Sequence, residues 1–138
     1  MTKVDFYILK NTSAQQRDIT ACRLTEKAYT QGLRVYLHTA NENHAQEMDK
    51  LLWSFRDRSF VPHSITDKTA PVTVGVDDNA SMTQCDVLIN LADKVPDCFS
   101  RFDRVLEIIN ADKTVRLQGR ERFRFYRDRG YTLDTHEL

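Results

Sequence analysis

An almost uninterrupted apolar run, CDVLINLA, spans residues 85–92. A strand with one face in water alternates apolar and polar residues, whereas a parallel strand covered on both faces does not. The run therefore predicts a central strand of a parallel sheet, with other layers of the protein packed on each of its faces. That requirement is typical of a three-layer α/β domain.

Segments typical of strands alternate with segments typical of helices along the chain. Short β-rich apolar runs predict strands, and capping residues followed by an apolar pattern of helical period predict helices. We expect strands at residues 4–9, 33–40, 72–76, 85–92 and 104–110, a helix that follows capping residues 11–13 and ends near 31, a helix capped by Asn41 that reaches 55, a helix at about 111–128, a helical turn at 98–103 and a short edge strand at 131–136. This order predicts one Rossmann-like α/β domain over residues 1–138, with a mostly parallel central sheet.

The glycine content separates this chain from nucleotide-binding members of that fold class. Such folds often bind phosphates at a glycine-rich turn after the first strand, where backbone N–H groups can approach the ligand. The corresponding turn here, KNTSAQQ, has no glycine, and neither GxGxxG nor GxxxxGK followed by Ser or Thr occurs anywhere. We therefore expect a Rossmann-like shape that lacks a glycine-rich nucleotide loop and uses no cofactor.

Several other classes of protein are disfavoured. No apolar run approaches the roughly 20 residues of a membrane span, and the N-terminal segment does not look like a signal peptide, so we expect a cytoplasmic protein. Cys22, Cys85 and Cys98 are far apart and form no CxxC pair, which indicates reduced thiols, some of them buried. No histidine pair has metal-ligand spacing and no serine lies in GxSxG, so the sequence predicts neither a metal site nor catalytic residues.

Positive charge is concentrated in one segment of a chain whose formal net charge is zero. Residues 113–130 contain seven Lys or Arg and two acidic residues, whereas residues 1–112 contain 13 Lys or Arg and 16 acidic residues. An acidic body with one basic segment indicates a local contact with an anionic partner. A protein that coats nucleic acid is usually basic throughout its domain, so the charge distribution argues against that class.

The basic segment places its charges on one side of the expected helix. At 100° per residue, Arg116, Arg120 and Arg127 fall within an arc of about 40°, with Arg124 about 40° beyond and Phe123 on the other flank. Arginine pairs bidentately with carboxylates, and a neighbouring aromatic ring can hold an apolar group. The stripe therefore suits an acidic peptide that ends in a free carboxylate, or a nucleic-acid strand with its phosphates on arginine and its bases on Phe123.

The other arginines of the same helix fall outside this stripe. Arg122 and Arg129 point elsewhere on the helical wheel, so we expect both side chains to be solvated.

Four long blocks of the sequence resemble a known family. In a chain of similar length, LLWSFRDRSFVPH, DVLINLA, FSRFDRVLEII and RERFRFYRDRGYTLDTH occur in the same order as in the chi subunits of bacterial DNA polymerase III holoenzyme. The resemblance covers nearly the whole chain. It implies a Rossmann-like accessory subunit of DNA replication without enzymatic activity. It also implies two partners: the psi subunit of the clamp loader, and the acidic C-terminal tail of single-stranded-DNA-binding protein, which ends in a phenylalanine carboxylate.

The resemblance also implies roles for particular residues. The tail site corresponds to Arg116, Arg120, Phe123 and Arg124, with Trp53 as a nearby tryptophan, and the psi-facing surface includes Phe60. Two alternatives stay open from the sequence: a module that binds single-stranded nucleic acid through the same stripe, and a small nucleotide-dependent enzyme of similar shape.

Overall fold

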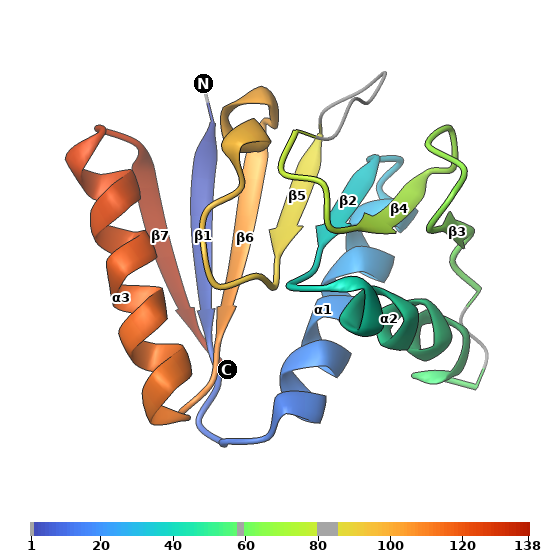
Figure 1. Ribbon diagram of the computed structural model, residues 1–138, viewed down its shortest axis with the longest axis horizontal. Helices are drawn as coiled ribbons and strands as arrows, with labels where there is room; N and C mark the ends of the chain where they lie inside the picture. Colours follow the sequence, from blue (N-terminus) through green and yellow to red (C-terminus); the bar gives the residue numbers. More distant parts are fainter. Residues whose placement is uncertain (1, 58–59, 80–85) are drawn as a thin grey trace.

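The chain forms one seven-stranded, all-parallel sheet in a computed structural model that describes residues 2–57, 60–79 and 86–138 (Figure 1). The strands stand in the order β3-β4-β2-β5-β6-β1-β7, and every pairing is parallel. The strands are β1 (Lys3–Ile8), β2 (Val35–His38), β3 (His63–Ser64), β4 (Val72–Gly75), β5 (Val87–Asn90), β6 (Arg104–Ile109) and β7 (Thr132–Glu137); the helices are α1 (Ala14–Thr30), α2 (Glu42–Ser54), α3 (Lys113–Asp128) and the 3₁₀ helix η1 (Asp97–Arg101). The prediction of a Rossmann-like, mostly parallel fold is confirmed.

Two apolar clusters lie on opposite faces of the sheet and make the domain three-layered. One contains the inner faces of α1 and α2, and the other contains those of η1 and α3. In β5, Val87 and Ile89 belong to the first cluster and Leu88 to the second. The strand is therefore covered on both sides, which explains its apolar run. Cys22 and Cys98 are buried, one in each cluster, whereas Cys85 lies outside the described residues.

A backbone hydrogen bond of the chain crosses the part of the sheet edge where a doubly wound fold commonly binds a ligand. The strands β1 and β6 are neighbours, and α1 and α3 leave their carboxyl ends on opposite faces. Between these ends, the backbone N–H of Ala111 donates to the carbonyl of Asn11 over 2.7 Å. At the start of α3, the Asp112 carboxylate accepts from the N–H groups of Thr114 and Val115. The backbone amides at the start of α3, which could otherwise receive a phosphate, are thus already bonded to a carboxylate of the chain.

The two ends of the sheet differ from one another. The edge strand predicted near the C-terminus is confirmed as β7, which pairs with β1. At the other end, β3 occupies a segment for which the sequence predicts a loop, because its two residues follow a proline and show no apolar alternation.

A buried carboxylate on β1 predicts an acid-dependent loss of stability. Asp5 is 1% exposed, accepts from Arg104 Nη2 over 2.6 Å, and lies 2.9 Å from His136 Nε2. Burial acts to raise the pKa of Asp5, but the bonds from Arg104 and His136 together hold it below its ordinary value. The carboxylate therefore stabilises the fold above about pH 4, the unfolded value, and this contribution is lost as the pH falls through the lowered folded pKa.

We expect Asp5→Asn to flatten the fall in the free energy of unfolding between about pH 4 and pH 2, and to cost about 1–3 kcal/mol at pH 7. Urea denaturation at several pH values measures both effects. The control is Asp134→Asn, which breaks a half-exposed pair with Lys3 and should leave both quantities close to those of the wild type, because exposed ion pairs contribute little to stability. Equal acid sensitivity of the wild type and Asp5→Asn would refute this account.

Candidate functional site

Helix α3 lies unusually close to the sheet at Gly119. A Cβ atom added there would stand 3.0 Å from Ile109 Cγ1 of β6, closer than side chains normally pack. One turn and two turns further on, Arg122 and Tyr126 are buried on the same face of the helix. Glycine at this position thus lets the first half of α3 approach β6, and the side chains beside it frame a surface pocket.

The pocket beside α3 combines an apolar floor with a cationic rim. Its volume is about 180 Å³, and it is lined by Phe6, Ile8, Ile109, Arg116, Gly119, Arg120, Phe123 and Thr135. The Phe123 ring packs edge-on against Phe6 with centroids 5.2 Å apart. Arg116 and Arg120 are exposed, and no ion pair joins either guanidinium to another described residue. Three of the residues predicted from the sequence, Arg116, Arg120 and Phe123, therefore meet in one pocket.

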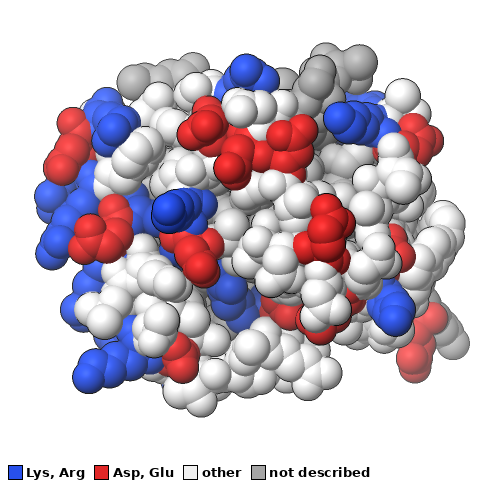
Figure 2. Space-filling model, in the orientation of Figure 1, with Lys and Arg blue, Asp and Glu red and all other residues white. Residues whose placement is uncertain are grey.

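The remaining arginines of the stripe are exposed but already paired. Arg124 Nη1 lies 3.1 Å from a Glu121 carboxylate oxygen, and Arg127 Nη2 lies 3.1 Å from Asp128. Neither residue lines the pocket. Exposed pairs of this kind contribute little to stability, so either guanidinium can exchange its partner for a ligand carboxylate. Figure 2 shows several Lys and Arg side chains close together along the α3 side of the molecule.

The prediction that Arg122 is solvated is wrong. Its side chain is 4% exposed, with Nε 2.9 Å from Glu107 Oε1 and Nη1 2.9 Å from the carbonyl of Asp93. Glu107 of β6 is fully buried and also accepts from the Tyr126 hydroxyl over 2.7 Å and from Asn90 over 3.0 Å. One arginine of the basic segment is therefore structural. The available signal was Glu107 within the apolar run RVLEII, because a buried carboxylate requires a partner.

The structure does not bring Trp53 to the arginine pocket. Helix α2, which carries it, packs on the sheet face opposite α3, so the expected proximity of Trp53 to the stripe is wrong. Its ring centroid lies 5.6 Å from that of Phe60 and 4.5 Å from that of His63. Trp53 is 53% exposed and Phe60 is 66% exposed. We call this pair the aromatic patch.

His63 gives the aromatic patch a fixed support. Its side chain is fully buried, and its ring nitrogens lie 2.6 Å and 3.0 Å from the carbonyl oxygens of Val61 and Asp49. Two large exposed aromatic rings on such a support are typical of a protein interface rather than of a small-molecule site.

The residues that the structure describes contain no group of three or more His, Cys, Asp or Glu side chains placed to hold a metal ion. None of their helices combines the length and the apolar character that crossing a membrane requires.

The fold and these surfaces define a Rossmann-like domain that presents a cation-rimmed pocket and, on another face, an aromatic patch. The family model described as DNA polymerase III chi subunit, HolC, matches residues 1–134. The chain therefore belongs to the DNA polymerase III chi subunit family, a family of replication subunits.

Full-length relatives agree with this membership. The chain is 43% identical to DNA polymerase III subunit chi of Pseudomonas aeruginosa over 140 residues, which cover 100% of this chain and 98% of the relative. It is 27% identical to the subunit of the same name from Escherichia coli, over 98% of this chain and 97% of that one. Among solved structures, T4 UvsW matches with a TM-score of 0.63 at 10% identity, covering 99% of this chain and 42% of that protein. The last likeness concerns the fold alone.

Proposed function

We propose that this chain is a non-catalytic accessory subunit that links the clamp loader of DNA polymerase III to single-stranded-DNA-binding protein. The observation that carries the proposal is the pocket beside α3, where two unpaired arginines border an aromatic and aliphatic floor. Such a site suits a group that is both anionic and apolar. The C-terminal tail of single-stranded-DNA-binding protein, with its acidic residues and terminal phenylalanine, has that chemistry.

The pocket dimensions agree with one aromatic side chain. An apolar cavity of about 150 Å³ holds benzene, so the 180 Å³ here is enough for the terminal phenyl ring. With the ring against Phe6 and Phe123, the terminal carboxylate would pair with Arg116 and Arg120, and upstream acidic residues would reach Arg124. We expect a Kd in the micromolar range, about −8 kcal/mol, because the contact is short and the tail is disordered before binding.

The aromatic patch is the proposed surface for the psi subunit. Phe60 keeps the role that the family resemblance gives it, and Trp53 joins it because the two rings lie side by side. The patch and the arginine pocket lie on different faces, so the domain could hold both partners at once. It would then act in the cytoplasm as a tether that keeps the clamp loader near coated single-stranded DNA.

Fluorescence anisotropy tests the tail site. We expect a labelled acidic peptide that ends in a free phenylalanine carboxylate to bind, and the same peptide with an amidated end to bind at least tenfold more weakly. Arg120→Ala should weaken the free-acid peptide by tenfold or more, because it removes a charge-assisted bond at the rim. The matched control is Lys50→Ala, an exposed cation on α2, which should have no effect.

The nucleic-acid alternative predicts a different result from the same assay. A labelled oligothymidine would then bind at least as tightly as the peptide, with an affinity that falls steeply with salt. Tight oligothymidine binding together with weak peptide binding would replace the tail-receptor proposal.

A further inference from the structure

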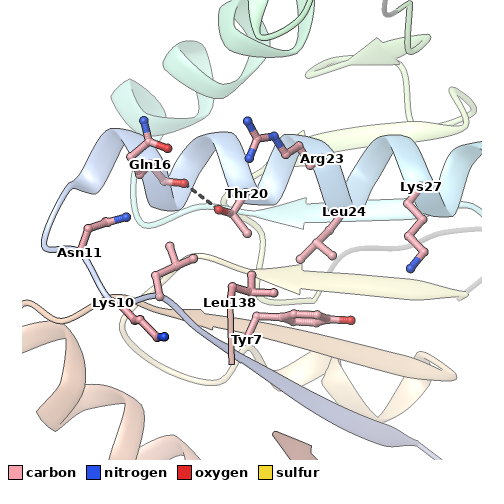
Figure 3. A pocket seen from close by; sticks show the side chains of 10 residues that line it. Tyr7, Lys10, Asn11, Gln16, Thr20, Arg23, Leu24, Lys27 and Leu138 are labelled. Carbon is pink, nitrogen blue, oxygen red and sulfur yellow. Dashed lines mark hydrogen bonds between the residues drawn. The ribbon is translucent and has the colours of Figure 1, made fainter. Parts of the chain in front are cut away.

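A second groove lies on the sheet face opposite the arginine pocket, between α1 and the strands β1 and β7. On this face α1 packs against β2, β5 and β6, so the sheet beside it, at β1 and β7, forms an open floor. Two hollows of about 670 Å³ and 510 Å³ share Tyr7, Leu24 and Lys27 among their lining residues and so form one continuous groove. Figure 3 shows Leu24 and Lys27 pointing from α1 toward Tyr7, with Lys10 at the end of the groove.

The rim of the larger hollow carries positive charge without counterions. Lys10, Arg23 and Lys27 are exposed lining residues, and none forms an ion pair with another described residue. Its described lining includes no acidic side chain. Arg23 and Lys27 are four apart on α1, a like-charge spacing that slightly destabilises a helix. These charges contribute little to the stability of the free chain, which favours a role in binding an anionic ligand.

The acidic residues of the neighbouring strands form no ion pair with these three cations. Asp5 pairs with Arg104 and His136, and Asp134 pairs with Lys3 over 2.8 Å. Glu137 of β7 is exposed and lines only the smaller hollow, and it forms no ion pair with another described residue. The floor is formed by Tyr7, Leu9 and Leu24 and is largely apolar. The groove therefore offers apolar contact along its base and unpaired cations along its edge.

We propose that this groove binds an acidic peptide segment whose apolar side chains rest on Tyr7, Leu9 and Leu24 while its carboxylates pair with Lys10, Arg23 and Lys27. The segment needs no free C-terminus, in contrast to the ligand proposed for the pocket beside α3. The groove is a separate site on the opposite sheet face, so this inference does not depend on the proposed function.

A peptide suits this floor better than a nucleic-acid strand. Single-stranded nucleic acid binds by stacking bases on free aromatic faces. One face of the Tyr7 ring already stacks on His136, with centroids 4.8 Å apart and planes 22° apart, which leaves a single aromatic face in the floor. The other floor residues, Leu9 and Leu24, are aliphatic, which favours apolar side chains of a peptide.

The test is an NMR titration of the ¹⁵N-labelled full chain with a ten-residue peptide in which Asp and Leu alternate, acetylated and amidated at its ends. We expect saturable amide shifts in the second half of α1 and at the end of β1. Replacing Lys10 and Lys27 together by alanine should weaken binding about tenfold, since each exposed pair contributes modestly. Lys50→Ala and Arg120→Ala should leave the affinity unchanged. Thermal unfolding checks that the double variant keeps its fold.

Three outcomes would overturn the proposal. The peptide could produce no saturable shifts, which would show that the groove has no affinity for this chemistry. Its shifts could instead cluster on α3 and vanish in Arg120→Ala, which would place it in the arginine pocket. An oligothymidine could shift the α1 amides more strongly than the peptide, which would make the groove a nucleic-acid site. Loss of tail-peptide binding in Arg120→Ala is measured separately, so the two proposals can fail independently.

Discussion

Arg122→Ala is expected to lower the free energy of unfolding by about 3–5 kcal/mol, because it leaves a buried carboxylate without its cationic partner. Glu107 would keep the hydroxyl of Tyr126 and the amide of Asn90, but its charge would be uncompensated inside the sheet. The carbonyl of Asp93 would lose its donor as well. Guanidinium chloride denaturation followed by circular dichroism measures the change.

Arg124→Ala is the matched control, two residues away on the same helix. Its guanidinium is exposed and paired with an exposed glutamate, so the loss should stay below about 0.5–1 kcal/mol. If Arg122→Ala proves too unstable to purify, Tyr126→Phe removes one donor to Glu107 and should cost about 1–3 kcal/mol. Equal stability of the Arg122 and Arg124 variants would contradict the structural role assigned to Arg122.

Most of the fold was predictable because local chemistry and tertiary environment agree along this chain. The run at 85–92 is apolar on both faces because β5 is covered on both faces. Ser13, one of the predicted capping residues 11–13, and the predicted cap Asn41 cap α1 and α2 with side-chain bonds, and Asp112 caps α3 in the same way. Each of these features is fixed within a few residues of sequence, which is the range over which pattern and propensity are informative.

The errors concern partners that lie far apart in the chain. A helical wheel separates the faces of α3 but does not reveal which face meets Glu107, 15 positions earlier. The position of Trp53 relative to α3 depends in the same way on contacts between distant parts of the chain, here on the order of the strands in the sheet. Crossovers between parallel strands are right-handed. From β1 the chain moves through α1 toward β2, whereas from β6 it moves through α3 toward β7, in the opposite direction across the sheet. Helices of opposite crossover direction lie on opposite faces of the sheet. The face on which each helix lies therefore follows from the order of the strands, which local sequence patterns do not determine.

Trp53→Ala should separate the two proposed partners. We expect it to weaken binding of purified psi subunit at least 30-fold, about 2 kcal/mol or more, as is typical when a central interface tryptophan is truncated. Binding of the free-acid tail peptide should change by less than twofold, because α2 and the pocket beside α3 lie on opposite faces of the sheet. Isothermal titration calorimetry with each partner measures both. Gln46→Ala, also exposed on α2, is the control.

Phe60→Ala compares psi binding with tail-peptide binding in the same way, and this residue lies outside the helices. The two rings are in contact, so if they form one interface, their truncations should be non-additive in a double-mutant cycle with psi. If Trp53→Ala instead weakened the tail peptide and spared psi, the tail would have to extend from the Arg120 pocket around the sheet to α2. Upstream truncation of the peptide would then abolish the Trp53 effect while leaving the Arg120 effect. That pattern would assign Trp53 to the tail site and leave Phe60 as the only residue of the aromatic patch proposed to contact psi.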